Sequence, residues 1–204
     1  MAKIKICGLS RLDDILIVNK VLPDYIGFVF VKSRRQITPQ QANILKLRLD
    51  DSIKSVGVFV NEDINIISDI CNDNIIDLVQ LHGNEDAEYI EKLKKLVTKP
   101  IIKAIRLKTS QDILQAQTTA SDFLLYDTYH DKEYGGTGIA FDWSIIPKTE
   151  KQIFLAGGIS TENVVDAIKF VCPYCVDVSS SVETDGIKDN RKIIEIVNKV
   201  RSVR

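Results

Sequence analysis

Eight short apolar runs recur at nearly regular intervals along this chain, and the repeat constrains the fold more than any other feature. The runs are rich in Ile, Val and Phe, and they begin near Lys3, Tyr25, Ser55, Leu78, Pro100, Phe123, Gln152 and Cys175. Their starts lie about 22 to 30 residues apart, which is the length of a strand followed by a crossover helix. Strands that are apolar at nearly every position are typical of a parallel sheet covered on both faces.

Segments with the periodicity of amphipathic helices separate these runs. The first predicted helix presents one apolar face made of Leu12, Ile15, Leu16 and Asn19. Another helix is predicted to begin at Thr38–Pro39, because Thr can cap a helix whose first position is Pro. Eight strand–helix units predict an α/β fold with a single domain over residues 1–204, closed into a (βα)8 barrel. An open doubly wound sheet is the alternative.

The composition is that of an ordinary globular protein. Of the 204 residues, 45% are hydrophobic and 27% are charged, and the formal net charge is -1. This balance argues against nucleic acid or a membrane surface as the main partner. No apolar run reaches the roughly 18 residues of a membrane span, and no signal peptide is expected before the first strand. Four cysteines do not make a disulfide scaffold, so the sequence predicts a cytoplasmic protein.

Polar side chains stand where several predicted strands end. Cys7 closes the first run before Gly8, Asp127 closes the sixth, and Ser179 follows the eighth. Strand alternation gives these three residues the inward parity, so they are predicted to point into the barrel mouth. A thiol facing a carboxylic acid there can work as a base and acid pair. For each residue alone, a small core side chain or a turn cap is the alternative.

Small residues cluster where backbone N–H groups can approach an anion, at Gly135–Gly138, Gly157–Gly158 and Ser179–Ser181. The last two clusters follow the seventh and eighth predicted strands, where barrels commonly hold a phosphate. The pattern favours a phosphorylated small molecule as the substrate.

Ten ordered stretches together resemble a known family. They are Lys5–Gly8, Gly27–Phe30, Ser33–Arg35, Gly57–Val60, Val79–Gly83, Asp127, Tyr134–Gly138, Phe141–Trp143, Ala156–Ile159 and Val176–Ser180. From end to end, the chain resembles the phosphoribosylanthranilate isomerases of tryptophan biosynthesis. The resemblance implies a TIM-type (βα)8 barrel that converts N-(5-phosphoribosyl)anthranilate into 1-(2-carboxyphenylamino)-1-deoxyribulose 5-phosphate. It implies this Amadori rearrangement without a metal or a cofactor.

The resemblance also implies roles for individual residues. Asp127 would be the general acid that opens the ribose ring, and Cys7 the general base that removes the C2 proton. Such an acid needs a raised pKa, and such a base needs nearby positive charge. Arg35 would clamp the anthranilate carboxylate. The implied substrate-binding set is Arg35, His82, Gly136, Gly138, Gly157, Gly158, Asp177, Ser179, Ser180 and Ser181.

The chain departs from the family pattern at two places. Ser181 stands where the family usually has glycine, which matters only if the site requires a positive φ. The segment around Arg34 and Arg35 is shorter than the usual version, and Arg35 fits the motif better than Arg34. The histidine-pathway isomerases perform the same rearrangement, but their first strand ends in Asp, where this chain has Cys7. A non-catalytic phosphosugar-binding barrel is the other alternative, and the chain is expected to be a monomer or a homodimer.

Several remaining residues have more than one interpretation. His82 either lines the pocket or is a hydrogen-bonded structural residue. His130 is expected in a solvated loop, and residues 128–134 are a candidate lid. Phe141 and Trp143 are expected to pack in the interior.

The pair Cys172 and Cys175 looks like a redox motif. It follows a predicted helix and leads into a strand, which disfavours that role, and it is only half of a zinc site. Barrel closure makes the first and eighth strands neighbours. Lys5 and Asp177 are therefore predicted to form a buried ion pair beneath the site.

Overall fold

The computed structural model describes residues 1–106, 119–127, 143–146 and 149–203 and contains a closed barrel of eight parallel strands. The strands are β1 (Lys3–Cys7), β2 (Tyr25–Val29), β3 (Lys54–Phe59), β4 (Leu78–Leu81), β5 (Ile101–Arg106), β6 (Phe123–Asp127), β7 (Ile153–Ala156) and β8 (Cys175–Val178). Each begins within one residue of its predicted start. Because β1 pairs with β8, the prediction of a closed barrel is confirmed and the open-sheet alternative is wrong.

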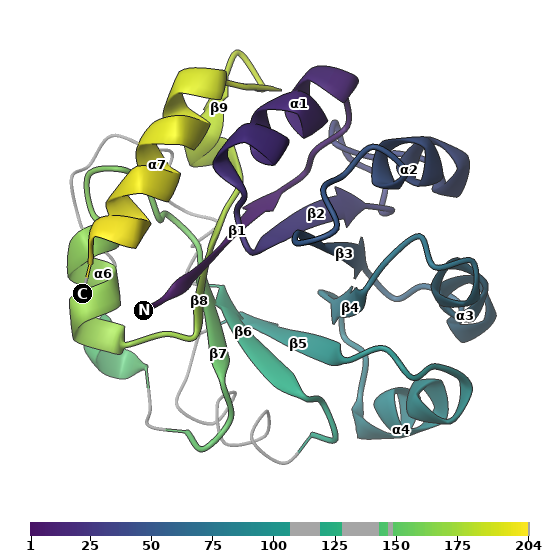
Figure 1. The fold of residues 1–204 in the computed structure, drawn as a ribbon. Helices are drawn as coiled ribbons and strands as arrows, with labels where there is room; N and C mark the ends of the chain where they lie inside the picture. Colours follow the sequence, from purple (N-terminus) through teal and green to yellow (C-terminus); the bar gives the residue numbers. More distant parts are fainter. Residues whose placement is uncertain (107–118, 128–142, 147–148, 204) are drawn as a thin grey trace.

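Helices surround the strands (Figure 1). In the described residues they are α1 (Leu12–Val21), α2 (Pro39–Lys46), α3 (Ile64–Asn72), α4 (Ala87–Leu96), α6 (Val164–Val171) and α7 (Asn190–Ser202). The predicted start of α2 is confirmed, since Thr38 accepts a hydrogen bond from the Gln41 amide and donates its own amide to the Gln41 side chain. Two 3-10 turns, η1 (Trp143–Ile145) and η2 (Ser180–Val182), and a small hairpin of β9 (Glu183–Thr184) and β10 (Ile187–Lys188) complete the described elements.

The predicted apolar face of α1 is partly wrong. Ile15 is buried as expected, but Leu12 and Leu16 are 47% and 60% exposed. The helix is turned so that Ile17 and Val18 also pack inward. Apolar residues occur all around this helix, so periodicity alone could not identify the buried face.

Two layers of side chains make up the core. Ile4 and Ile6 of β1 pack outward into the large cluster between the strands and the helices, as strand alternation predicts. Inside the barrel, a smaller apolar cluster includes Tyr25, Leu125 and Phe154. The buried polar residues Lys5, Gln80 and Asp177 lie on β1, β4 and β8. Their inward side chains form the floor of the site described next.

Candidate active site

A cavity of about 540 Å³ opens at the carboxyl ends of the strands, where parallel barrels place their active sites. Ten of the twelve predicted site residues line it: Cys7, Arg35, His82, Asp127, Gly157, Gly158, Asp177, Ser179, Ser180 and Ser181. The other two, Gly136 and Gly138, lie outside the described residues. The fold therefore brings together side chains and loops from β1, β2, β4, β6, β7 and β8.

Cys7 is the last residue of β1, and its backbone lies opposite Gly27 of β2. A Cβ atom at Gly27 would lie 2.7 Å from the Cys7 sulfur, so only glycine leaves room for the thiol. Burial raises the pKa of the Cys7 thiol above its ordinary value, although the positive charges of Lys5 and Lys188 oppose the rise. The thiol is therefore subject to two opposing influences, burial and the positive charges of two lysines.

The predicted ion pair beneath the cavity is confirmed. Lys5 Nζ lies 2.7 Å from Asp177 Oδ2, and the Lys5 side chain is fully buried. The same ammonium donates a hydrogen bond to Gln80 Oε1 at 2.9 Å. Burial alone would lower the pKa of Lys5, but the charges of Asp177 and Cys7 outweigh it and raise the pKa. Lys5 is therefore a permanent cation at the base of the site.

A hydrogen-bonded chain leads from this lysine to Asp127. Because the Lys5 ammonium can only donate, the Gln80 amide must turn its oxygen toward Lys5 and its nitrogen toward His82 Nδ1, 2.9 Å away. His82 Nδ1 is then an acceptor, and the ring proton resides on Nε2. His82 Nε2 donates to Asp127 Oδ2 at 3.2 Å. The two alternatives for His82 are thus both met, because it lines the cavity and is also hydrogen-bonded.

Arg35 and Arg34 differ in their relation to the cavity. Arg35 lines it with a side chain that is 24% exposed, whereas the Arg34 side chain is 58% exposed and does not line it. Both guanidinium groups pair with one buried carboxylate, Glu183. Hydrogen bonds from Arg35 and Lys188 outweigh the effect of burial and lower the pKa of Glu183 to about 2.

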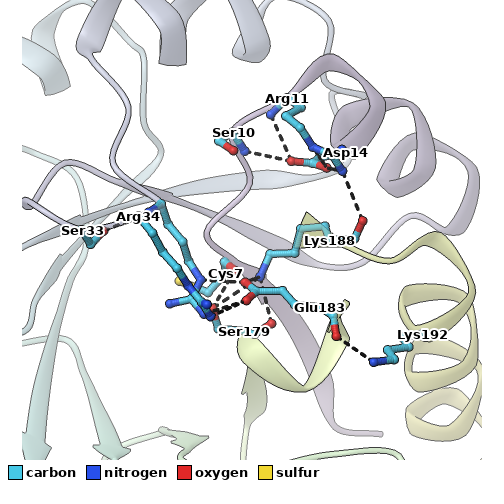
Figure 2. A network of polar contacts seen from close by, with 11 residues as sticks. Cys7, Ser10, Arg11, Asp14, Ser33, Arg34, Ser179, Glu183, Lys188 and Lys192 are labelled. Carbon is cyan, nitrogen blue, oxygen red and sulfur yellow. Dashed lines mark hydrogen bonds and ion pairs between the residues drawn. The ribbon is translucent and has the colours of Figure 1, made fainter. Parts of the chain in front are cut away.

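Figure 2 shows Glu183 and Lys188 close to Cys7 and Ser179. The sequence pattern did not predict Glu183, Lys188 or Gln80 as residues of the site. For Gln80, the alternation of side chains along β4 could have predicted that it points into the barrel. Glu183 and Lys188 follow Ser179–Ser181 closely in the sequence, but no periodic pattern predicted their direction.

The loops after β7 and β8 have the backbone shapes that an anion site needs. Gly157 and Gly158 have φ values of 80° and 65°, a region that favours glycine. Ser179 to Ser181 lead into the turn η2, and Ser181 is not among the residues with positive φ. The replacement of the usual glycine by Ser181 therefore introduces no backbone strain. The buried Ser181 Oγ has no hydrogen-bond partner among the described residues.

The remaining candidate residues lie away from this cavity or outside the described residues. Cys172 ends α6 in the left-handed region and Cys175 is buried in β8. Burial raises the pKa of the Cys175 thiol well above its ordinary value, which opposes redox chemistry. Trp143 packs against the core as expected, whereas His130, Phe141 and the candidate lid 128–134 are outside the described residues.

The described residues were also compared with the requirements of a metal site, a membrane span and a second ligand pocket. No cluster of three or more potential metal ligands occurs among them. None of the helices within these ranges combines the length and apolar character needed to cross a membrane. A second hollow of about 710 Å³ lies beside the amino ends of β7 and β8, between residues such as Trp143, Phe170 and Tyr174. Its described lining contains no carboxylate and none of the predicted site residues.

Comparisons with known proteins indicate one family. The family model for N-(5'phosphoribosyl)anthranilate (PRA) isomerase matches residues 4–199. An N-(5'-phosphoribosyl)anthranilate isomerase of Endomicrobium trichonymphae is 50% identical over 203 residues, covering 100% of both chains. The crystal structure of phosphoribosyl anthranilate isomerase from Thermotoga maritima is 36% identical with a TM-score of 0.88, covering 98% of this chain and 99% of that one.

A further similar structure contains a ligand. It is a phosphoribosyl anthranilate isomerase in complex with reduced 1-(o-carboxyphenylamino)-1-deoxyribulose 5-phosphate, and it is 33% identical to this chain with a TM-score of 0.84. The alignment covers 98% of this chain and 99% of that one. That ligand carries a carboxylate at one end and a phosphate at the other.

Proposed function

Because the chain belongs to the N-(5'-phosphoribosyl)anthranilate isomerase family, we propose that Cys7 and Asp127 are the base and acid of its reaction. The chain is an aldose–ketose isomerase of tryptophan biosynthesis. It converts N-(5-phosphoribosyl)anthranilate into 1-(2-carboxyphenylamino)-1-deoxyribulose 5-phosphate. The observation that carries the proposal is that a thiol on β1 and a carboxyl group on β6 line one cavity above a buried cation.

The two groups divide the proton transfers between them. Asp127 donates a proton to the ribose ring oxygen, so the ring opens to a protonated Schiff base between C1 and the anthranilate nitrogen. The Cys7 thiolate then takes the proton from C2, and the electron pair moves to give the enolamine. Return of this proton from Cys7 to C1, with loss of the proton on the C2 hydroxyl to the Asp127 carboxylate, yields the ketone and restores both groups. His82 holds Asp127 through Oδ2 while this occurs.

Positive charge beneath and beside Cys7 supports its role as a base. Lys5 and Lys188 favour the thiolate, whereas burial favours the thiol and prevails in the free protein. The thiolate population therefore increases with pH, and the rate follows it only while Asp127 still holds its proton. This electrostatic balance also explains why the fold buries a charged lysine beneath the reacting groups.

The substrate's two anionic ends have separate partners in this proposal. Arg35 binds the anthranilate carboxylate, and the backbone of Gly157–Gly158 and Ser179–Ser181 binds the phosphate. Gly136 and Gly138 are proposed for substrate binding from the family resemblance alone. Between the ends, Asp177 Oδ1 is a buried acceptor with no partner in the described residues, so we propose that it receives a hydrogen bond from the sugar.

The experiment that tests these roles is isomerisation of freshly made phosphoribosylanthranilate, followed by loss of its fluorescence. We expect turnover by the wild type and a fall in kcat of about 10²- to 10⁴-fold for both Cys7→Ser and Asp127→Asn. Both variants should retain the reduced product analogue, because neither change removes a proposed anion-binding group. Wild-type protein that binds the analogue without turnover would instead support a non-catalytic phosphosugar-binding barrel.

We also propose that residues 1–204 act as one isomerase domain, as a monomer or as a homodimer in which each copy has its own site. Ten of the twelve proposed site residues gather in one cavity of a single chain, which supports a site within each copy. The four cysteines are unpaired thiols, which fits our proposal of a cytoplasmic location. Sedimentation and cell fractionation test the two statements separately.

A further inference from the structure

We propose that Glu183 is a positioning residue that holds the Arg35 guanidinium so that its free edge faces the cavity and binds the substrate carboxylate. The inference rests on the proposed role of Arg35 as the carboxylate clamp. Glu183 does not line the cavity, so its proposed effect on the substrate carboxylate is exerted through the arginine.

The contact between the two side chains is side-on. Arg35 Nε donates to Glu183 Oε1 at 2.6 Å, and Arg35 Nη2 donates to Oε2 at 2.9 Å. Two parallel bonds fix the plane of the guanidinium as well as its position. Nη1 has no hydrogen-bond partner among the described residues, and Arg35 lines the cavity. The edge that carries Nη1 is therefore available to a ligand.

Glu183 is itself firmly held. Its side chain is only 4% exposed, and Lys188 Nζ donates to Oε1 at 2.7 Å while Arg34 Nη2 donates to Oε2 at 2.7 Å. Each carboxylate oxygen therefore accepts two hydrogen bonds. Lys188 is anchored in turn to the Ser179 carbonyl at 2.9 Å. These contacts leave the carboxylate little freedom to move when a ligand arrives.

The charged side chains around Glu183 carry a net positive charge that a bound anion would neutralise. Arg34, Arg35 and Lys188 surround a single carboxylate, so the cluster has two positive charges in excess. Like charges held this close repel one another. In an ion-pair network with a purely structural role, we expect equal numbers of positive and negative charges. A substrate with a carboxylate and a phosphate supplies the missing negative charge. We therefore interpret the excess as part of substrate recognition.

The hairpin of β9 and β10 explains how this arrangement is built. Glu183 and Lys188 are register partners in the antiparallel pair, so their side chains leave neighbouring strands together. The first turn of α7 adds a further restraint, since Lys192 Nζ donates to the Glu183 carbonyl at 2.7 Å. The hairpin thus places the Glu183 carboxylate and the Lys188 ammonium side by side at the rim of the barrel.

The test measures how strongly the protein distinguishes ligands with and without a carboxylate. The two probes are reduced 1-(o-carboxyphenylamino)-1-deoxyribulose 5-phosphate and its phenylamino counterpart without the carboxylate, with binding measured by calorimetry. For Glu183→Gln we expect the carboxylated probe to bind about 10- to 100-fold more weakly, because a hydrogen bond to a charged group is misplaced. The probe without the carboxylate should bind within about threefold of its wild-type affinity. Equal weakening of both probes would overturn the proposal.

Two further variants distinguish a specific loss of carboxylate binding from a general loss of stability. Glu183→Asp keeps the charge for Lys188 but is one methylene too short for the side-on pair, so it should show the same selective loss to a smaller extent. Asp77→Asn is the matched control, because Asp77 also pairs with a lysine, Lys46, but lies before β4 at the opposite end of the barrel. It should lose stability without any change in the ratio of the two affinities. A similar ratio change in Asp77→Asn would identify a general structural effect instead.

A double-mutant cycle separates this inference from the function on which it rests. If Glu183 acts on carboxylate binding through Arg35, adding Glu183→Gln to Arg35→Ala should weaken binding of the carboxylated probe by less than about twofold further. Losses that multiply would overturn the positioning role. If Arg35→Ala alone leaves kcat/KM and the affinity ratio unchanged, the clamp assigned under the proposed function is wrong. If Arg35→Ala is impaired and Glu183→Gln is not, only the role of Glu183 is wrong.

Discussion

Two clusters of buried charge flank the proposed catalytic thiol, and they are built on opposite principles. The inner cluster pairs Lys5 with Asp177 one to one, inside the barrel and beneath the cavity. The rim cluster sets three cations against Glu183 alone. The charges of the inner pair cancel without a ligand. The rim cluster has a net positive charge, which a bound anion would neutralise.

The difference indicates what each cluster contributes. A neutral buried pair can tune the proton affinity of Cys7 without attracting ions into the barrel interior. A cationic rim attracts an anionic substrate and orients it. Because the two clusters are separate, the electrostatic environment of the reacting groups stays fixed when the rim cluster binds or releases an anionic substrate.

Breaking the inner pair should have the largest effect on stability. Lys5→Met leaves the buried Asp177 without its partner, and we expect a loss of about 3–5 kcal/mol in the free energy of unfolding, measured with urea. The double variant Lys5→Met/Asp177→Leu should regain much of this loss, because replacing both charges is often nearly neutral. It should not regain activity, since Cys7 lacks the charge of Lys5 in both variants. A double variant no more stable than Lys5→Met would contradict a pairwise interaction.

Breaking the rim cluster should have a smaller effect that depends on pH. The pKa of Glu183 is lowered from 4.5 to about 2, so its ionised form stabilises the fold fully above pH 4.5 and this contribution disappears as pH falls toward 2. Glu183→Gln should therefore lower the unfolding free energy by about 1.5–3 kcal/mol at pH 6. The difference from wild type should shrink steadily as pH falls from 4.5 toward 2 in urea titrations. A constant difference over that range would show that the charge of Glu183 is not involved.

Lys188 connects the two clusters, and removing its charge should change the pH dependence of the rate. Burial raises the pKa of Cys7, so kcat/KM should increase by up to about tenfold per pH unit while the thiolate is the minor form and Asp127 still holds its proton. Lys188→Met removes an opposing cation, which raises the pKa of Cys7 further and moves the rise to higher pH. Rates of alkylation by iodoacetamide should move in parallel. These are measured with Cys172→Ser in both proteins, since Cys172 is also exposed. Unchanged profiles would remove Lys188 from the environment of the thiol.

Much of the inner cluster could be predicted from the sequence, because strands are regular. The two-residue alternation along β1 and β8, together with closure of the barrel, was enough to predict that Lys5 and Asp177 meet. Cys7 and Asp127 were brought to one place by the same reasoning, since the carboxyl ends of parallel strands converge. The roles of these residues stay predictions.

The rim cluster could not be predicted in the same way. Glu183 and Lys188 lie in a short hairpin after a 3-10 turn, where no periodic pattern fixes the direction of a side chain. The choice between Arg34 and Arg35 also depended on geometry, because adjacent residues in a loop have no assigned faces. The buried face of α1 failed for a related reason, since apolar residues surround the helix. Gly136 and Gly138 stay predictions outside the described residues.

The smallest expected effect distinguishes the two arginines of the rim. Arg34 shares Glu183 with Arg35 but is 58% exposed, so Arg34→Gln should lower stability by less than about 1 kcal/mol. Its KM should rise by less than about threefold at low salt, and this difference should vanish near 0.5 M salt, where screening removes the effect of an exposed charge. Arg35→Gln, which faces the cavity, should keep its larger KM at every salt concentration. Steady-state kinetics at two ionic strengths measure both. If Arg34→Gln shows the larger, salt-independent loss, then Arg34 is the clamp and Arg35 only supports it.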